Sequence, residues 1–145
     1  MTLQGQKQDL LNLVTKLAAS QLEHGGFIFP FGAVLGPGRH IKLIKPQSWK
    51  ENPTRNEVER YWARVLSKAS SDTGGKLVCW CSVVDASWDE GDWKSCVLIH
   101  LEQAEALSED MFYPYEQTEG CQVVFGLPTV VKTSPQVFGF SERVN

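Results

Sequence analysis

The chain has 145 residues, of which 42% are hydrophobic and 21% are charged. This is the size and composition of one globular domain with a single core, and it excludes a disordered protein. The net charge of -3 and the scattered basic residues argue against nucleic-acid binding, because such proteins neutralise phosphates with clustered lysine and arginine.

The apolar residues form no run that could cross a membrane, since no stretch approaches the roughly 20 residues required. The N-terminal residues Met1–Gln8 also lack the apolar segment behind a positive cluster that marks a signal peptide. We therefore expect a cytoplasmic protein that does not associate with membranes. Its four cysteines should then be reduced thiols.

Two segments, Gln8–His24 and Thr54–Ser71, have the apolar spacing of amphipathic helices. Apolar residues recur at i, i+3, i+4 and i+7, which places them on one stripe of a helix. Gly25–Gly26 can close the first helix, because glycine readily adopts the left-handed conformation. Thr54 and Glu57 fit a capping box at the start of the second helix.

Between these helices the sequence predicts a pair of strands. Phe27–Leu35 is apolar on both faces and is typical of a buried strand. Pro30 has no amide for the ladder, which indicates an edge position or a bulge. Gly36–Arg39 is a turn, and Ile41–Ile44 then returns as an antiparallel partner because the connection is short.

After the second helix, Lys76–Val84 is the clearest strand of the chain, and Lys94–Glu102 is another. Both are rich in the β-branched and aromatic residues that favour strands. Between them, Asp85–Trp93 is acidic and is predicted to be a loop. These two strands should pair in an antiparallel manner.

The last part of the chain has weaker patterns. Met111–Tyr115 is predicted to be a short strand that runs into a turn, and Gln122–Lys132 a last strand interrupted by a proline. The final residues, Thr133–Asn145, should form an irregular tail that packs through Phe138 and Phe140.

The predicted order of elements is α-β-β-α-β-β-β, within one globular domain over residues 1–145. The short connections favour an antiparallel sheet of about five strands with the two amphipathic helices packed on it. This is an α+β fold.

Several short stretches together resemble a family of small bacterial proteins of uncharacterised function. They are Phe29–Leu35, Val97–Glu102, Phe112–Tyr115 and Val124–Gly126. The resemblance implies a fold of this kind and no particular activity. This chain departs from the family pattern in its longer, alanine-containing connection before Met111 and in its many cysteines and tryptophans.

The cysteines allow two interpretations. Cys79 and Cys81 are two apart, so on a strand both thiols would face the same side. With Cys96 and Cys121 from other strands they could form a four-thiolate zinc site, although the C-x-x-C spacing is absent. Free cysteine more often behaves as a small buried hydrophobe. We expect buried thiols, and no metal or other cofactor.

Among the three histidines, His24 lies at the end of the first helix and His40 in a turn. His100 lies within a predicted strand, on the face that carries Cys96. These two are roughly 13 Å apart along a strand, which is too far for a nucleophile and its base.

The predicted loop at Asp85–Trp93 carries four carboxylates, at Asp85, Asp89, Glu90 and Asp92. Carboxylates in a loop can hold a cation such as Ca²⁺, but their spacing here differs from that of an EF-hand. A solvated acidic loop is the alternative that we expect.

Trp88 and Trp93 lie in the same acidic segment. Tryptophan beside charge is typical of a contact surface. With no assembled catalytic motif in the sequence, we predict a non-catalytic binding or interaction domain, whose partner is another protein or a second copy in a homodimer. The alternative is a small enzyme or ligand-binding protein with a pocket near His100, in which Cys96 and Glu102 are the further candidates.

Overall fold

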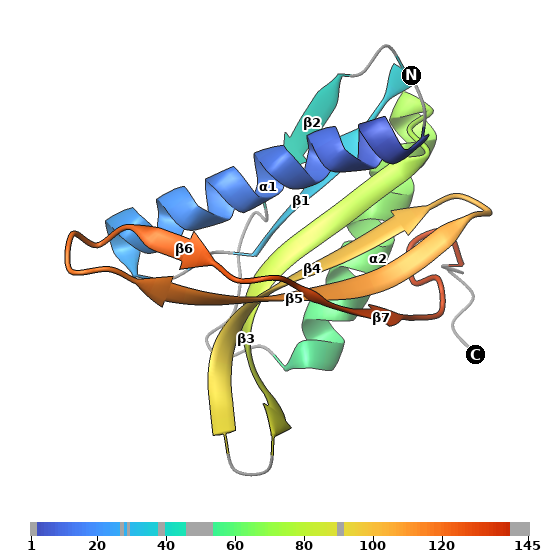
Figure 1. Ribbon diagram of the computed structural model, residues 1–145. Coiled ribbons are helices and arrows are strands. Elements are labelled where there is room, and N and C mark those ends of the chain that lie inside the picture. The colour runs from blue at the N-terminus through green and yellow to red at the C-terminus, as the bar shows by residue number, and fades with distance from the viewer. Residues whose placement is uncertain are drawn as a thin grey trace.

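The computed structural model describes residues 3–26, 28, 30–37, 40–45, 54–89 and 92–139, with the backbone alone for 3–4, 85–89 and 92–94 (Figure 1). The helices are α1 (Leu3–Gly25) and α2 (Arg55–Thr73). The strands are β1 (Phe31–Leu35), β2 (Ile41–Ile44), β3 (Leu77–Asp89), β4 (Asp92–Gln103), β5 (Leu107–Gln117), β6 (Val123–Phe125) and β7 (Thr129–Lys132). Within the described residues, neither helix is long and apolar enough to span a bilayer.

All seven strands belong to one antiparallel sheet, in the order β2-β1-β3-β4-β5-β6, with β7 also paired to β5. The predicted α+β class is confirmed. The sheet has seven strands rather than about five. Met111–Tyr115, predicted as a short strand, is part of the full strand β5, and Gln122–Lys132 divides into β6 and β7, which lie one after the other along β5. Between them, the Gly126 amide donates to the Pro114 carbonyl at 2.8 Å.

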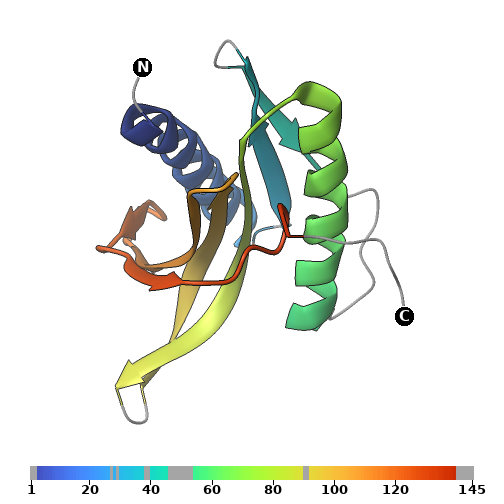
Figure 2. The same ribbon diagram turned by 90° about the vertical axis from the view of Figure 1, so that its right-hand side faces the viewer.

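The two helices lie on opposite faces of the sheet, so the domain has three layers (Figure 2). Side chains alternate between the two faces along each strand. Because a helix covers each face, apolar side chains are buried on both faces. One core cluster joins α1 to the sheet through Leu10, Val14, Ala33, Cys79 and Ile99. The other joins α2 to the opposite face through Trp62, Leu66, Val34, Trp80 and Leu98.

Local signals in the sequence determine where the second helix begins and ends. The Thr54 side chain accepts the Glu57 amide and the Glu57 side chain accepts the Thr54 amide, which confirms the predicted capping box. The helix stops at Gly74, whose φ of 74° is left-handed.

Two local predictions about strands are wrong. β1 is an inner strand between β2 and β3, and Pro30 precedes its first residue, so proline does not mark an edge strand here. The predicted loop at Asp85–Trp93 is mostly strand, because β3 continues to Asp89 and β4 begins at Asp92. The pairing of β3 with β4 shifts register in this part, between Ala86 and Asp89.

The tail after β7 packs against the α2 side of the sheet. Val137 is 1% exposed and belongs to the core cluster there, and the partly buried Phe138 packs against the same cluster. The predicted contact of Phe138 is confirmed, and Phe140 lies outside the described residues.

The close approach of α2 to β1 depends on Gly32. A Cβ at this position would lie 2.8 Å from the Trp62 ring and 3.1 Å from a methyl of Leu66. We expect Gly32→Ala to lower the free energy of unfolding by about 1–3 kcal/mol, as overpacking does in well-packed cores. Urea unfolding measures this, with Gly36→Ala as the control, because the nearest atom to a Cβ there is 3.7 Å away. Equal effects of the two substitutions would contradict it.

Candidate functional site

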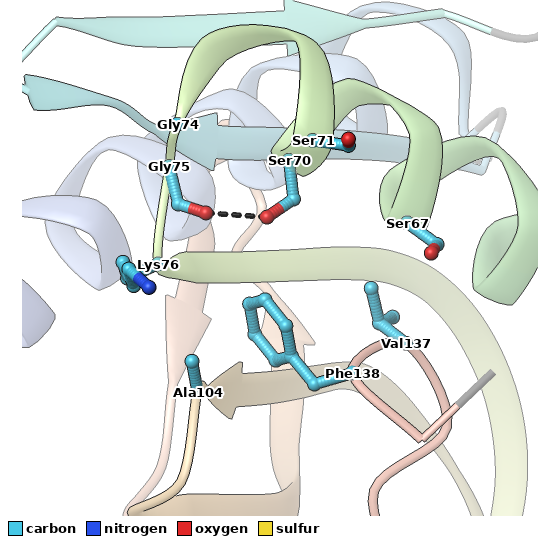
Figure 3. A pocket seen from close by; sticks show the side chains of 9 residues that line it. All are labelled: Ser67, Ser70, Ser71, Gly74, Gly75, Lys76, Ala104, Val137 and Phe138. Atoms are coloured by element: carbon cyan, nitrogen blue, oxygen red, sulfur yellow. Dashed lines mark hydrogen bonds between the residues drawn. The ribbon is translucent and has the colours of Figure 1, made fainter.

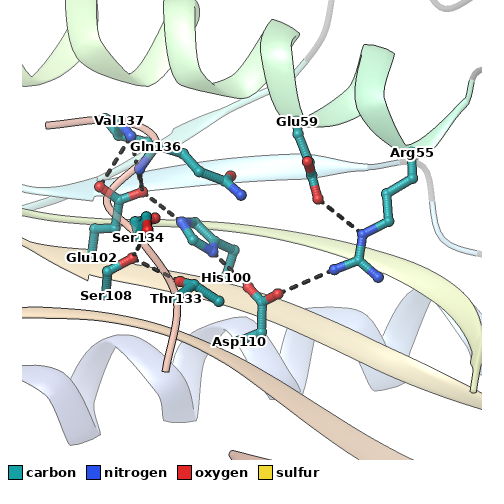
Figure 4. Close-up of polar contacts among 10 residues, drawn as sticks. All are labelled: Arg55, Glu59, His100, Glu102, Ser108, Asp110, Thr133, Ser134, Gln136 and Val137. Carbon is teal, nitrogen blue, oxygen red and sulfur yellow. Dashed lines mark hydrogen bonds and ion pairs between the residues drawn. The ribbon is translucent and has the colours of Figure 1, made fainter. Parts of the chain in front are cut away.

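The chemically richest part of the described structure is a buried polar cluster around His100 (Figure 4). Its Nε2 lies 2.5 Å from Oε2 of Glu102, and its Nδ1 lies 2.6 Å from Oδ1 of Asp110. Glu102 is on the same face of β4 because it is two residues away from His100. Asp110 stands directly opposite His100 on β5. The sheet register thus places a carboxylate at each ring nitrogen.

The imidazole is fully enclosed by the sheet and the groups around it. Trp80 is the residue opposite His100 on β3, and the two rings stack with centroids 5.6 Å apart and planes inclined by 27°. The exposed fraction of His100 is 0%, and that of Glu102 is also 0%. His100 is therefore sealed in the interior.

The two carboxylates keep His100 charged. Burial alone disfavours the imidazolium, but the hydrogen bonds that it donates to Asp110 and Glu102, together with their negative charges, outweigh burial and raise the pKa of His100 to about 9. For Glu102, burial favours the neutral acid, but the bonds from His100 and from backbone amides lower its pKa. The cluster is thus an internal group of ion pairs.

Glu102 also binds the segment that follows β7. Its carboxylate accepts the backbone amides of Gln136 at 2.8 Å, Val137 at 2.9 Å and Phe138 at 3.1 Å. Ser108 of β5 supports the same segment, because its Oγ lies 2.8 Å from Oγ1 of Thr133. One buried side chain therefore fixes the C-terminal segment on the sheet.

On its other side the cluster reaches the start of α2. Nη2 of Arg55 donates to Oδ2 of Asp110 at 3.1 Å, and its Nε donates to Glu59 at 2.9 Å. The arginine side chain is 50% exposed, whereas that of Asp110 is 7% exposed. The chain of contacts from Arg55 to Glu102 links α2, β5, β4 and the C-terminal segment.

The side chain of His100 is buried, and both of its ring nitrogens are bonded to carboxylates. The ring can therefore neither take a proton from a substrate nor contact a ligand. Of the candidates named with it, Glu102 is brought into contact. Cys96 is not, because it lies four residues along the same strand, opposite Val84 and Pro114. The cluster joins β4 and β5 to the C-terminal segment and to α2.

The cysteines are placed in three different surroundings. Cys79 and Cys81 are buried under α1, where burial raises the pKa of Cys79 to about 12 and that of Cys81 well above its usual range. Cys96 is also buried, and Cys121 is exposed, so the expectation of buried thiols is wrong for Cys121 alone. Among the described residues, no group of three or more His, Cys, Asp or Glu side chains is arranged to hold a metal ion.

The other two histidines lie on the surface. His24 is exposed at the end of α1, with Nδ1 2.7 Å from the Ser20 carbonyl, and His40 is exposed before β2. Neither lies in the cluster around His100.

Trp88 and Trp93 lie on a hairpin that projects from the domain, at the bottom of Figure 1. β1 pairs with β3 only from Leu77 to Cys81, and β5 pairs with β4 only from Cys96 onward. Among the described residues, Ser82–Asp89 therefore pairs with β4 alone and Asp92–Lys94 pairs with β3 alone; we call these two segments the arm. The side chains of Trp88 and Trp93 lie outside the described residues.

A cleft of about 540 Å³ lies at the base of the arm. Its walls come from the connection before β1, the start of α2 and the first residues of the arm, and include Ile28, Pro30, Arg55, Val58, Trp80 and Ser82–Val84. Trp80 and Arg55 also contact His100 and Asp110, so the cleft adjoins the buried cluster without exposing it.

A second hollow, of about 340 Å³, lies at the other end of α2 (Figure 3). Ser67, Ser70 and Lys76 contribute to its walls together with Phe138. Ser70 uses its hydroxyl to donate to the Gly75 carbonyl. The C-terminal end of a helix carries partial negative charge, so an anion is disfavoured here despite the lysine.

Sequence reasoning missed Asp110 and Arg55, the two members of the cluster that come from β5 and α2. Neither belongs to a recognisable motif, and only the register of β4 with β5 brings Asp110 to His100.

Comparison of the chain with models of known protein families, with curated proteins and with solved structures finds no match. The resemblance to small uncharacterised bacterial proteins therefore stays a prediction.

Proposed function

We propose that the protein is a non-catalytic interaction domain of the cytoplasm and that the arm contacts its protein partner. The observation that carries this proposal is that, in the part of the chain that the structure describes, Ser82–Asp89 pairs with β4 alone and Asp92–Lys94 pairs with β3 alone. Each of these segments has one backbone edge without a strand beside it in the described structure.

A two-stranded hairpin of this kind is only marginally stable by itself in water. Its unpaired amides and carbonyls are a template for another chain, and native proteins usually cover or block such edges. The arm also carries Trp88 and Trp93, and tryptophan is the residue most enriched at the energetic centres of interfaces. An arm of this composition is well suited to bind a partner.

We expect Trp88→Ala and Trp93→Ala to abolish capture of the partner without lowering the melting temperature. An interface tryptophan typically contributes about 2 kcal/mol or more, and so about thirtyfold or more in affinity. Affinity purification with quantitative mass spectrometry, from cells that express the protein, measures capture. Leu127→Ala is the control, because Leu127 is apolar and 92% exposed but distant from the arm in sequence. A fall in melting temperature with capture intact would instead make the tryptophans packing residues.

A second candidate function is the binding of a small molecule in the cleft beside the cluster. Clefts of a few hundred Å³ with apolar walls and few polar groups are typical ligand sites, and this one has a volume of about 540 Å³. Native mass spectrometry of freshly purified protein distinguishes the two functions. A reproducible added mass would favour a ligand, and the bare mass of one or two chains would favour the interaction domain.

A further inference from the structure

Pro30 explains why β1 stops pairing with β3 after Cys81. In the antiparallel pairing of β1 with β3, the last pair is Phe31 with Cys81, so Pro30 would stand opposite Ser82. Proline has no backbone amide to donate, and a ladder usually ends where it occurs. β3 nevertheless continues to Asp89. Among the described residues no strand pairs with β3 on the β1 side beyond Cys81, so β3 has an edge there that begins at Ser82.

The cleft at the base of the arm runs along this edge. Ser82, Val83 and Val84 all line it, although consecutive residues of a strand point to opposite faces. A cleft on one face of the sheet would meet every second residue, so contact with all three places part of the cleft at the edge of the strand. Leu98 of β4 and Tyr115 of β5 also line it, so the cleft extends from this edge over the sheet. The opposite wall includes Ile28 and Pro30, from the chain just before β1.

The lining of the cleft indicates what kind of group fits there. Val58 and Leu98 make it apolar. Trp80, which is 1% exposed, closes the cleft on the side of the buried cluster. Arg55 is already paired with Glu59 and Asp110, so it does not demand an acidic ligand. An apolar side chain of a polypeptide fits these walls.

Charge identifies the partner further. The sequence from Ser82 to Ser95 has four carboxylates and one lysine, a net charge of -3 that equals the charge of the whole chain. The remaining 13 acidic and 13 basic side chains balance. Pairing two copies of the arm would bring like charges together, which is unfavourable across strands. A basic segment of a different protein is complementary to the arm.

We propose that an extended, basic segment of a partner polypeptide adds as a strand to the edge of β3 from Ser82 toward Asp89. Its backbone pairs with the edge, one apolar side chain enters the cleft at the base of the arm, and its positive charge complements the net negative charge of the arm sequence. This inference rests on the proposed function and specifies its partner. Strand addition of this type takes affinity from main-chain hydrogen bonds and specificity from side-chain pockets.

A phage-displayed library of random peptides of about twelve residues, panned against the full chain, tests this proposal. We expect enriched peptides to combine lysine or arginine with an apolar anchor. Val84→Lys should weaken their binding by about tenfold or more, because a charge guards an edge against pairing. Val124→Lys is the matched control: it makes the same change at another strand, β6, where Val124 is 56% exposed.

Hydrogen exchange of the unaltered chain gives a readout that does not depend on the folding of a variant. An enriched peptide, added as a synthetic compound, should slow exchange of the amides between Ser82 and Asp89. Strand addition would be overturned if the library yielded no enriched peptides or only acidic ones. It would also be overturned if Val84→Lys and Val124→Lys weakened peptide binding equally, or if the peptide did not slow amide exchange between Ser82 and Asp89. Binding that depends on Trp88 and Trp93 but not on Val84 would leave the interaction domain standing and remove this inference alone.

Discussion

Glu102→Ala is expected to lower the free energy of unfolding by about 3–5 kcal/mol, the usual cost of removing one partner of a buried ion pair. The substitution would leave the imidazolium of His100 buried with Asp110 as its one remaining carboxylate. It would also remove the acceptor of three backbone amides, from Gln136 to Phe138. Equilibrium unfolding in urea measures the loss. Hydrogen exchange at Val137, which is buried in the native protein, should rise as the segment detaches.

Two further variants distinguish the stability lost by breaking the buried ion pair from the stability lost by removing any glutamate. Glu116→Ala removes a carboxylate from an exposed position of β5 and should change stability by less than about 0.5 kcal/mol. The double variant Glu102→Ala with His100→Leu should recover part of the loss, because the unpaired charge is then gone. A loss below about 1 kcal/mol in the single variant would show that the buried pair contributes little.

The elements of the fold that sequence reasoning predicts well are those with local signals. The capping box at Thr54 and the apolar stripe of α2 lie within one segment, and the short turn before Ile41 dictates an antiparallel pair. Each of these features depends on residues close together in the chain, and the structure confirms them.

The strands of the arm between Asp85 and Trp93 were not predicted, because the amino-acid composition there is typical of a loop. Aspartate and glycine are depleted in strands, so the acidic segment indicates a loop. Its backbone is nevertheless extended and paired across the hairpin, with an irregular register between Ala86 and Asp89. Pairing with the neighbouring strand overrides the local propensity there.

The polar cluster could not be predicted because it depends on register. Asp110 meets His100 through the turn between β4 and β5, where Ala106 donates to the Gln103 carbonyl and Glu105 adopts a φ of 63°. A turn residue with positive φ is usually glycine or asparagine, and the turn from Gln103 to Leu107 contains neither. The C-terminal segment likewise has no periodic pattern, and its position follows from Glu102.

The cluster also predicts how stability depends on pH. The pKa of His100 is about 9 in the folded protein, above its ordinary value of 6.5, because the carboxylates of Asp110 and Glu102 outweigh burial. The folded state therefore holds this proton more tightly than the unfolded chain. Its contribution, about 3 kcal/mol, is complete below pH 6.5 and is lost as the pH rises through about 9. The pKa of Glu102 is lowered, so its contribution is present above its ordinary value of 4.5 and falls in acid.

Stability should accordingly be highest between about pH 4.5 and pH 6.5 and should decline toward pH 9. Urea unfolding at successive pH values measures this profile. His100→Gln keeps a polar side chain of similar length but cannot take up a proton in this range, so the decline between pH 6.5 and pH 9 should largely disappear. If the variant and the wild-type protein lost stability equally over that interval, the imidazolium would not be the group responsible. The C-terminal segment would then be held by the hydrogen bonds from its backbone amides to Glu102, independently of the protonation of His100.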